Sequence, residues 1–238
     1  HQAYREWLQQ LRDVCTQKNI VLIFDEVFVG FRLGVGGAQE YFDVQADLVT
    51  YGKTIGGGLP VGVLAGKSEL MKRFRDDRPA DVCFARGTFN SHPYVMATMN
   101  EFLRYAASAE FAASSESALL NWDTRIGRLN EGLKQRQLPI RLHNLASICI
   151  IVYTNVSRFN WMLQYYLRAA GLSLSWVGTG RLIFSHNYTD EEFDAVCECI
   201  YSAAEAMRAD GWWSGSALTS DAAIRKRVLK ELIAESFG

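Results

Sequence analysis

An aspartate and a lysine, each following a short apolar run, are the residues of this 238-residue chain best placed to do chemistry. Asp25 follows the run Ile-Val-Leu-Ile-Phe at residues 20–24, a pattern typical of a fully buried parallel strand. Lys53 follows a second apolar run at residues 48–52 and opens a glycine-rich stretch. Because parallel strands bring their carboxyl ends to one edge of a sheet, we expect the carboxylate and the amine to lie close together.

Such a pair suits pyridoxal phosphate above other cofactors. This cofactor needs a lysine amine for its Schiff base and an acid that keeps its ring nitrogen protonated as an electron sink. A nucleotide site is the competing interpretation, because a strand ending in Asp-Glu also fits a Walker B motif and Gly52-Lys53-Thr54 could end a P-loop. That spacing requires glycine at position 47, where this chain has aspartate, and the following glycines do not favour a helix. The spacing therefore argues against a nucleotide site.

The elements that must position this pair alternate between helix and strand. Apolar residues between positions 4 and 15 have helical spacing, and the apolar run before Asp25 follows them directly. After a glycine-containing loop, strands are predicted at residues 48–51 and 61–66. This order predicts an α/β fold with a mostly parallel sheet.

A second, smaller α/β domain is predicted from about residue 113. Residues 91–137 are compatible with helix, and we expect a break or kink near 112–115. The later predictions are a helix ended by Gly171 and a capping box formed by Thr189 and Glu192. Strands are expected at residues 140–145, 147–154, 172–176 and 181–186. The domains are therefore expected to span 1–112 and 113–238, the second with a terminal helix.

Composition excludes several classes of protein. The net charge is −1, with 25 basic and 26 acidic residues, so nothing indicates a nucleic-acid or membrane partner. The five cysteines are scattered and form no Cys-x-x-Cys pair, which favours reduced thiols and a cytoplasmic location. The longest apolar run, residues 148–153, is too short to cross a bilayer. The four histidines lack ligand spacing, so no metal site is expected.

Several short motifs in residues 21–66 occur in an order that is specific to one protein family. They are Asp-Glu-Val, Gly-Phe-Arg, Gly-Lys and Gly-Gly-Gly-Leu-Pro-Val-Gly. With them, the chain resembles the class III (ornithine/GABA-type) pyridoxal-phosphate aminotransferases of fold type I, particularly the glutamate-1-semialdehyde aminomutase-like branch. The resemblance is dense in residues 1–105 and looser beyond them. It implies that the chain holds the C-terminal part of the large pyridoxal-phosphate-binding domain, followed by the small C-terminal domain.

The resemblance also implies roles for four residues. Asp25 binds the pyridine nitrogen, Val27 packs against one face of the ring, and Lys53 is the Schiff-base lysine and proton carrier. Thr88, in the segment Gly87-Thr88, reaches the cofactor phosphate of the neighbouring subunit, which implies a homodimer with a shared active site. A hydroxyl beside a glycine is a sensible anion contact, although alone it would be taken for a turn threonine.

Two further charged residues have open interpretations. Glu26 is expected to be structural, on the other side of the strand end from Asp25, and paired with an arginine such as Arg32. Arg181 stands where relatives that bind an α-carboxylate place an arginine. Here His186-Asn187 replaces the family's following Pro-Pro, so a surface or ion-paired arginine is an equal interpretation.

The predicted activity is transamination, in which an amino group moves from an amino-acid donor to an aldehyde or keto acceptor through a Lys53 Schiff base. Two alternatives stay open: an aminomutase of the glutamate-1-semialdehyde type, and a non-catalytic aminotransferase-like segment of a larger synthase. In this family the phosphate-binding helix and the aromatic that stacks on the ring lie upstream of the Asp-Glu-Val strand. The chain is therefore expected to be the C-terminal half of a protomer, with an incomplete site, from either a free-standing or a multidomain biosynthetic enzyme.

Overall fold

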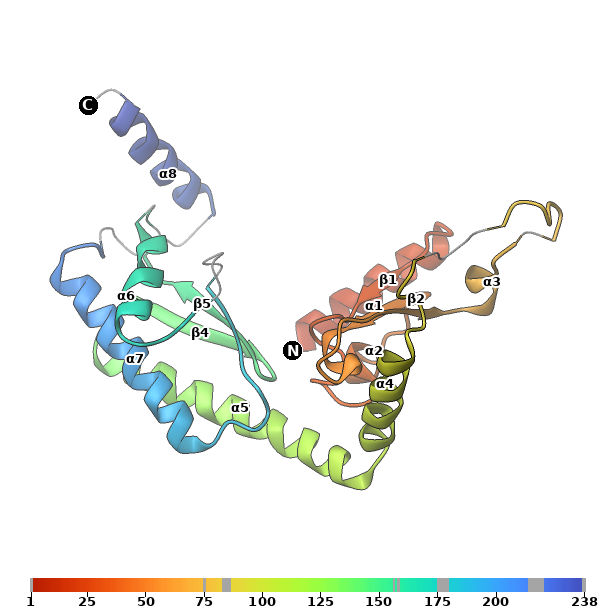
Figure 1. Ribbon diagram of the computed structural model, residues 1–238. Coiled ribbons are helices and arrows are strands. Elements are labelled where there is room, and N and C mark those ends of the chain that lie inside the picture. Colours follow the sequence, from red (N-terminus) through yellow and green to blue (C-terminus); the bar gives the residue numbers. More distant parts are fainter. Residues whose placement is uncertain are drawn as a thin grey trace. The chain divides into compact units, whose positions relative to one another are not determined.

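The computed structural model describes residues 2–74, 76–82, 87–155, 157, 159–174, 180–213 and 221–236. The chain divides into two compact units, His1–Ser117 and Ala118–Gly238. Each unit contains one three-stranded sheet with helices beside it (Figure 1). The two units are described one at a time.

The first unit is built on a mixed sheet with the strand order β1-β2-β3. Strands β1 and β2 are parallel, and β2 and β3 are antiparallel. Its elements are α1 (Gln2–Gln17), β1 (Ile23–Asp25), α2 (Gly37–Phe42), β2 (Leu48–Gly52), the 3₁₀ turn η1 (Lys53–Gly56), β3 (Gly62–Gly66), α3 (Ser68–Met71) and α4 (Pro93–Ala106). The parallel pair confirms that Asp25, the last residue of β1, and Lys53, which follows β2, lie at the same ends of neighbouring strands.

Strand β1 is shorter and more exposed than the sequence predicted. It begins at Ile23 rather than at Ile20, and both of these side chains are 53% exposed. Among the described residues, β1 pairs with β2 alone and forms an edge of the sheet. The prediction of a fully buried strand at residues 20–24 is therefore wrong for this chain, because the described elements leave Ile20, Val21 and Ile23 exposed and bury the other two side chains only in part.

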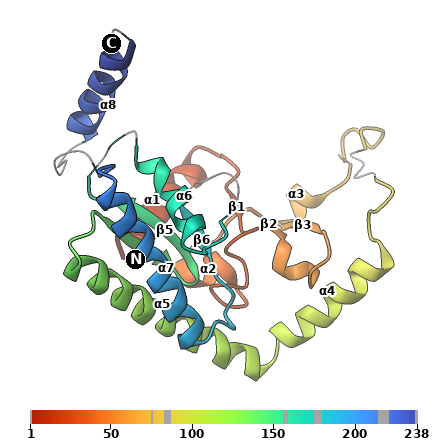
Figure 2. The same cartoon turned by 60° about the vertical axis from the view of Figure 1, so that its left-hand side comes forward.

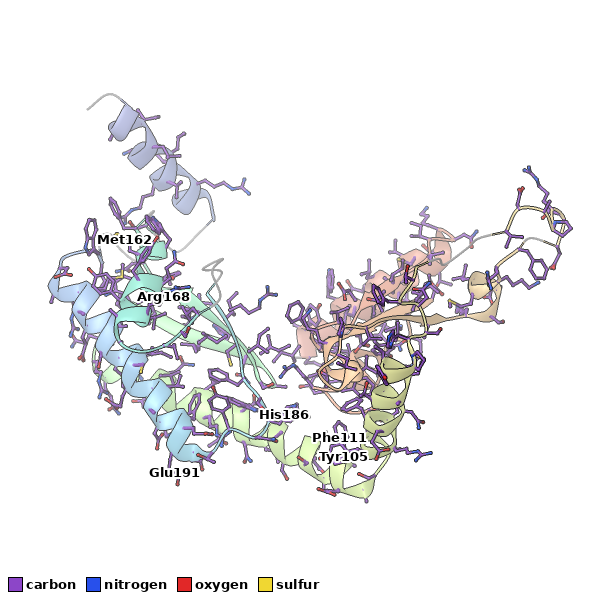
Figure 3. The ribbon with its side chains drawn as sticks, in the orientation of Figure 1. Tyr105, Phe111, Met162, Arg168, His186 and Glu191 are labelled. Carbon is purple, nitrogen blue, oxygen red and sulfur yellow. The ribbon has the colours of Figure 1, made fainter. Side chains whose placement is uncertain are left out.

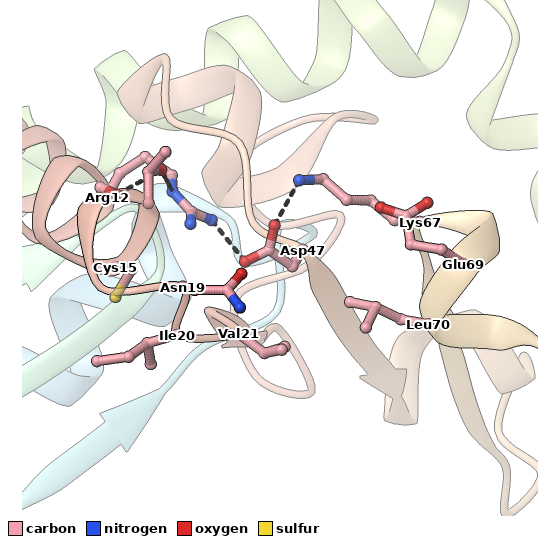
Figure 4. A pocket seen from close by; sticks show the side chains of 10 residues that line it. Arg12, Cys15, Asn19, Ile20, Val21, Asp47, Lys67, Glu69 and Leu70 are labelled. Atoms are coloured by element: carbon pink, nitrogen blue, oxygen red, sulfur yellow. Dashed lines mark hydrogen bonds and ion pairs between the residues drawn. The ribbon is translucent and has the colours of Figure 1, made fainter.

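A buried carboxylate holds together the amino ends of the two parallel strands (Figure 4). Asp47, immediately before β2, accepts hydrogen bonds at Oδ2 from the backbone N–H of Leu22 and from Arg12 of α1, both at 2.8 Å. Its Oδ1 lies 2.6 Å from Nζ of Lys67, which follows β3. The backbone N–H of Asp47 also donates to the carbonyl of Leu22 at 2.8 Å. These bonds fix the alignment of β1 with β2.

The helical region after residue 92 breaks earlier than predicted. Helix α4 ends at Ala106 and α5 (Ala109–Gln135) begins three residues later, so the break is at residues 107–108 and the prediction of 112–115 is wrong. Ser108 explains the position, because its hydroxyl donates to the carbonyl of Tyr105 at 2.6 Å and accepts from the N–H of Phe111 at 3.2 Å. The Tyr105 and Phe111 rings pack edge to face beside this break, with their centroids 5.5 Å apart (Figure 3).

The second unit has an antiparallel sheet with the order β4-β5-β6. Its further elements are β4 (Ile140–Leu145), β5 (Ile148–Tyr153), the 3₁₀ turn η2 (Asn160–Met162), α6 (Leu163–Ala169), β6 (Arg181–Ile183), α7 (Asp190–Ala209) and α8 (Asp221–Ser236). Helices α5, α6 and α7 share one core with the sheet, and they lie beside it in Figure 2. The fully buried members of this core include Trp122, Leu142, Leu163 and Phe193.

Most of the predicted elements of this unit are confirmed. The capping box at α7 is present, with Thr189 accepting from the N–H of Glu192 at 3.2 Å and Glu192 accepting from the N–H of Thr189 at 2.9 Å. Gly171 follows the end of α6 with φ +98, as a helix-ending glycine should. The strand predicted at residues 172–176 is absent at 172–174, and its last two residues lie outside the described ranges.

Candidate functional site

Asp25 stands at the end of β1 with one carboxylate oxygen fixed. It lies opposite Thr50 of β2, whose hydroxyl donates to Oδ1 at 3.1 Å. The backbone N–H of Val27 donates to the same oxygen, also at 3.1 Å. In the part of the chain that the structure describes, no hydrogen bond involves Oδ2 of Asp25. The carboxylate is therefore held in one orientation and keeps an acceptor for a further partner.

The turn after β1 brings two side chains onto the end of β2. Its closing bond runs from the N–H of Gly30 to the carbonyl of Glu26 at 2.8 Å, and a Cβ at Gly30 would lie 2.7 Å from that carbonyl oxygen. Val27 packs over Gly52, where an added Cβ would meet a methyl group of Val27 at 3.3 Å. The ring of Phe28 lies beneath the amine of Lys53, with Nζ 4.0 Å from the ring centroid.

Lys53 has a left-handed backbone, with φ +50, which is uncommon for a residue other than glycine. It follows the extended Gly52 and begins η1. Helix α4 supports this turn, because the hydroxyl of Thr98 donates to the carbonyl of Gly56 at 3.1 Å. Lys53 is exposed, so its amine is open to a ligand at the strand end.

Glu26 has a different role from its neighbour Asp25. It is only 1% exposed, and its Oε2 accepts from the backbone N–H of Ala38 in the first turn of α2 at 2.8 Å. Burial raises the pKa of this carboxyl above its ordinary value, against the opposing effect of backbone hydrogen bonds from Ala38 and Gln39. Burial, and then the nearby Glu26, also raise the pKa of Tyr51. Glu26 therefore anchors the glycine loop to the strand end, through backbone groups.

The structure does not bring Thr88 to the group formed by Asp25, Val27 and Lys53. Thr88 is exposed in a turn whose N–H of Asn90 donates to the carbonyl of Gly87 at 3.1 Å. Within the described residues, no hydrogen bond joins Thr88 to any of the three. Arg181 is in the second unit, at the start of β6, where it is paired opposite Ile150 of β5.

The residues that the structure describes contain neither a metal-binding cluster nor a membrane-spanning helix. The described ranges contain no group of three or more His, Cys, Asp or Glu side chains placed to hold a metal ion. No helix within those same ranges has the length and apolar character that a membrane span needs.

Comparison with known proteins identifies the family. The sequence profile of a family described as Aminotransferase class-III matches residues 2–204. The chain belongs to the class-III aminotransferases. The matched residues include the motifs, the parallel strand pair and Lys53. The resemblance inferred from the motifs of residues 21–66 is confirmed.

Curated relatives and solved structures agree with this family. The glutamate-1-semialdehyde 2,1-aminomutase of Methanococcus vannielii is 38% identical over 151 residues, which are 63% of this chain and 33% of that protein. An omega-transaminase from Sphaerobacter thermophilus is 25% identical, with a TM-score of 0.73 over 86% of this chain and 48% of that one. A structure described as a transaminase with PLP bound is also 25% identical, with a TM-score of 0.72 over 87% of this chain and 49% of that one. The chain thus spans about a third of the curated relatives' length and has part of the fold of a fold type I pyridoxal-phosphate transferase.

The residues present fit pyridoxal phosphate on the side of the ring nitrogen and the reactive carbonyl. Asp25 offers Oδ2 as an acceptor for a ring N–H, and Val27 gives an apolar surface beside Gly52. Lys53 offers an exposed primary amine at the same end of the strand pair. This donor set, an amine and a carboxylate at the same strand ends, supplies the two groups that the cofactor requires.

Sequence reasoning missed two residues of this site. Thr50 orients Asp25. The parallel pairing could have indicated it, because the register places Thr50 directly opposite Asp25, the last residue of β1. Phe28 contacts Lys53, and no sequence signal distinguishes it from the other apolar residues of its turn.

Proposed function

We propose that the full-length protein is a pyridoxal-phosphate-dependent aminotransferase in which Lys53 carries the cofactor and moves protons. The observation that carries this proposal is the convergence of Lys53 and Asp25 on one end of a parallel strand pair. When bound, the cofactor supplies a carbonyl that links covalently to amines and a ring that accepts the electrons left by proton removal.

The roles of the chain's own residues follow from their contacts. Asp25, held at Oδ1 by Thr50 and the backbone of Val27, accepts from the ring nitrogen with Oδ2 and keeps that nitrogen protonated. Val27 packs against one ring face. Lys53 would hold the cofactor through its amine, and when that amine is free, Nζ would move a proton on and off the donor's α-carbon. The substrates are a small amino donor and an aldehyde or keto acceptor.

The proposed assembly is a cytoplasmic homodimer in which Thr88 contacts the cofactor phosphate bound by the neighbouring subunit. Two features of Thr88 support this proposal: it is exposed, and no hydrogen bond in the described part of the chain joins it to Asp25, Val27 or Lys53. A hydroxyl next to Gly87 is a suitable anion contact. We also assign residues 1–112 to the large cofactor-binding domain and 113–238 to the small domain.

Borohydride reduction of the cofactor-loaded, full-length protein tests the role of Lys53. The reduced adduct should map to the peptide that contains Lys53 and should be lost in Lys53→Ala. Lys72→Ala is a matched control, because that exposed lysine pairs with Asp76 away from the strand ends. An adduct on any other lysine would contradict the proposal.

An aminomutase is the second candidate, and the names of relatives such as the Methanococcus vannielii protein favour it. The two activities differ in stoichiometry. A transaminase consumes one amino donor for each acceptor, whereas an aminomutase isomerises a single amino aldehyde with no external donor. Incubation with glutamate-1-semialdehyde alone, followed by product analysis, distinguishes them.

A further inference from the structure

We propose that Phe28 is a positioning residue that holds the uncombined amine of Lys53 on its ring face. The inference rests on the proposed function of Lys53. Nζ of Lys53 lies 4.0 Å from the ring centroid of Phe28, well inside the distance at which a cation is attracted by the negative face of an aromatic ring.

The position of the Phe28 ring is fixed by its turn. The N–H of Gly30 closes the turn on the carbonyl of Glu26, and Glu26 is itself buried and bonded to the N–H of Ala38. Val27, the preceding residue, packs over Gly52, the residue before Lys53. Two consecutive residues of the turn therefore contact two consecutive residues at the end of β2, and this pairing fixes the ring relative to the lysine.

The consequence for Lys53 follows from the nature of its side chain. A lysine has a flexible four-carbon stem and a strongly hydrated ammonium, so an exposed lysine samples many positions. The ring of Phe28 favours the positions in which a protonated Nζ stays at the strand end, over the face of the ring. Phe28 thereby keeps the released amine within the site while it is not covalently engaged.

Competitive acylation of the cofactor-free, full-length protein with trace acetic anhydride measures how strongly Lys53 is held. Without the ring face, Lys53 in Phe28→Leu should react about two- to fivefold faster than in the wild type, the range expected for a cation over an exposed aromatic face. Phe28→Tyr should match the wild type. Lys67, paired with Asp47 at the opposite end of the strands, should react at the same rate in every protein and so serves as the internal reference for folding.

Pentafluorophenylalanine at position 28 separates attraction from shielding, because it keeps the shape of the ring and reverses the charge of its face. In the pentafluoro protein Lys53 should be acylated as fast as in Phe28→Leu. This protein also tests the inference if Phe28→Leu fails to fold. Equal Lys53 rates in the wild type and the pentafluoro protein would overturn the inference. Borohydride mapping of the wild type decides the proposed function separately, since a lysine other than Lys53 could carry the adduct whatever the acylation rates show.

Discussion

Replacing Asp47 by asparagine removes a buried negative charge from the junction of α1, β1 and β3. The carboxylate is paired with Arg12 at 2.8 Å and with Lys67 at 2.6 Å, and it accepts the N–H of Leu22 at 2.8 Å. Asparagine keeps an acceptor for Leu22 but leaves both cations without their partner. We therefore expect the free energy of unfolding of the first unit to fall.

The size of the loss follows from the exposure of each partner. Lys67 is 54% exposed, so its pair contributes less than about 1 kcal/mol. Arg12 and Asp47 are 16% and 8% exposed, and breaking a buried pair costs about 3–5 kcal/mol. Because asparagine retains one hydrogen bond and Arg12 reaches some water, we expect Asp47→Asn to lose about 2–3 kcal/mol.

Urea denaturation followed by circular dichroism measures this loss. With a slope of about 2 kcal/mol/M, the midpoint should fall by about 1–1.5 M in Asp47→Asn. Lys67→Met is the matched control and should shift the midpoint by less than half as much. Hydrogen exchange of the β1 and β2 amides shows whether the loss is in the first unit.

The pH dependence provides a further test of the same reasoning. The hydrogen bond from Leu22, then those from Lys67 and Arg12, hold the pKa of Asp47 well below its ordinary 3.8. A lowered pKa gives stability that is present above pH 3.8 and is lost as the pH falls below it. The advantage of the wild type over Asp47→Asn should therefore shrink in acid. A shift below about 0.5 kcal/mol at neutral pH, or an advantage unchanged down to pH 2, would refute the argument.

Three other changes test the site. The raised pKa of Glu26 means that its contribution to stability falls as the pH rises above 4.5. Glu26→Gln should therefore flatten this decline when thermal unfolding is followed as a function of pH. Glu26→Ala should cost about 1–3 kcal/mol of unfolding free energy, because it leaves N–H groups of α2 unpaired. Asp25→Asn should retain the borohydride-fixable linkage yet lose about 2–4 kcal/mol of transition-state stabilisation in kcat/KM, and near-normal turnover would exclude its role. Mixing Lys53→Ala with Thr88→Val subunits should restore activity above either parent if the site is shared, and confirmed subunit exchange without a gain would contradict the homodimer proposal.

The placement of Asp25 and Lys53 at the same ends of neighbouring strands could be predicted because it depends on local patterns. An apolar run that ends in a charged residue marks a strand end, and parallel pairing places two such ends together. The exposure of Ile20 and Ile23 could not be predicted in this way. Burial depends on which other elements cover a strand, and an apolar run carries no information about its neighbours.

The side-chain contacts across the turn after β1 could not be predicted from the sequence either. Phe28 and Val27 are both apolar residues after a strand, and only the folded turn shows that one meets Lys53 and the other Gly52. The helix break was misplaced for a related reason. Ser115 is as plausible a helix-breaking serine as Ser108, but only the hydroxyl of Ser108 accepts from the N–H of Phe111 to begin a new helix.

The left-handed backbone of Lys53, at φ +50, has a consequence for how this residue should be replaced. Glycine adopts this conformation freely, whereas a residue with a Cβ pays roughly 1–2 kcal/mol, partly offset by the greater freedom of glycine in the unfolded chain. The unfolding free energy of Lys53→Gly should therefore exceed that of Lys53→Ala by about 0.5–1 kcal/mol. Lys53→Gly should accordingly melt at a higher temperature. Alanine removes the amine but keeps the Cβ that strains this backbone, whereas glycine removes both. The free energy of unfolding is thus lower with lysine at this position than it would be with glycine.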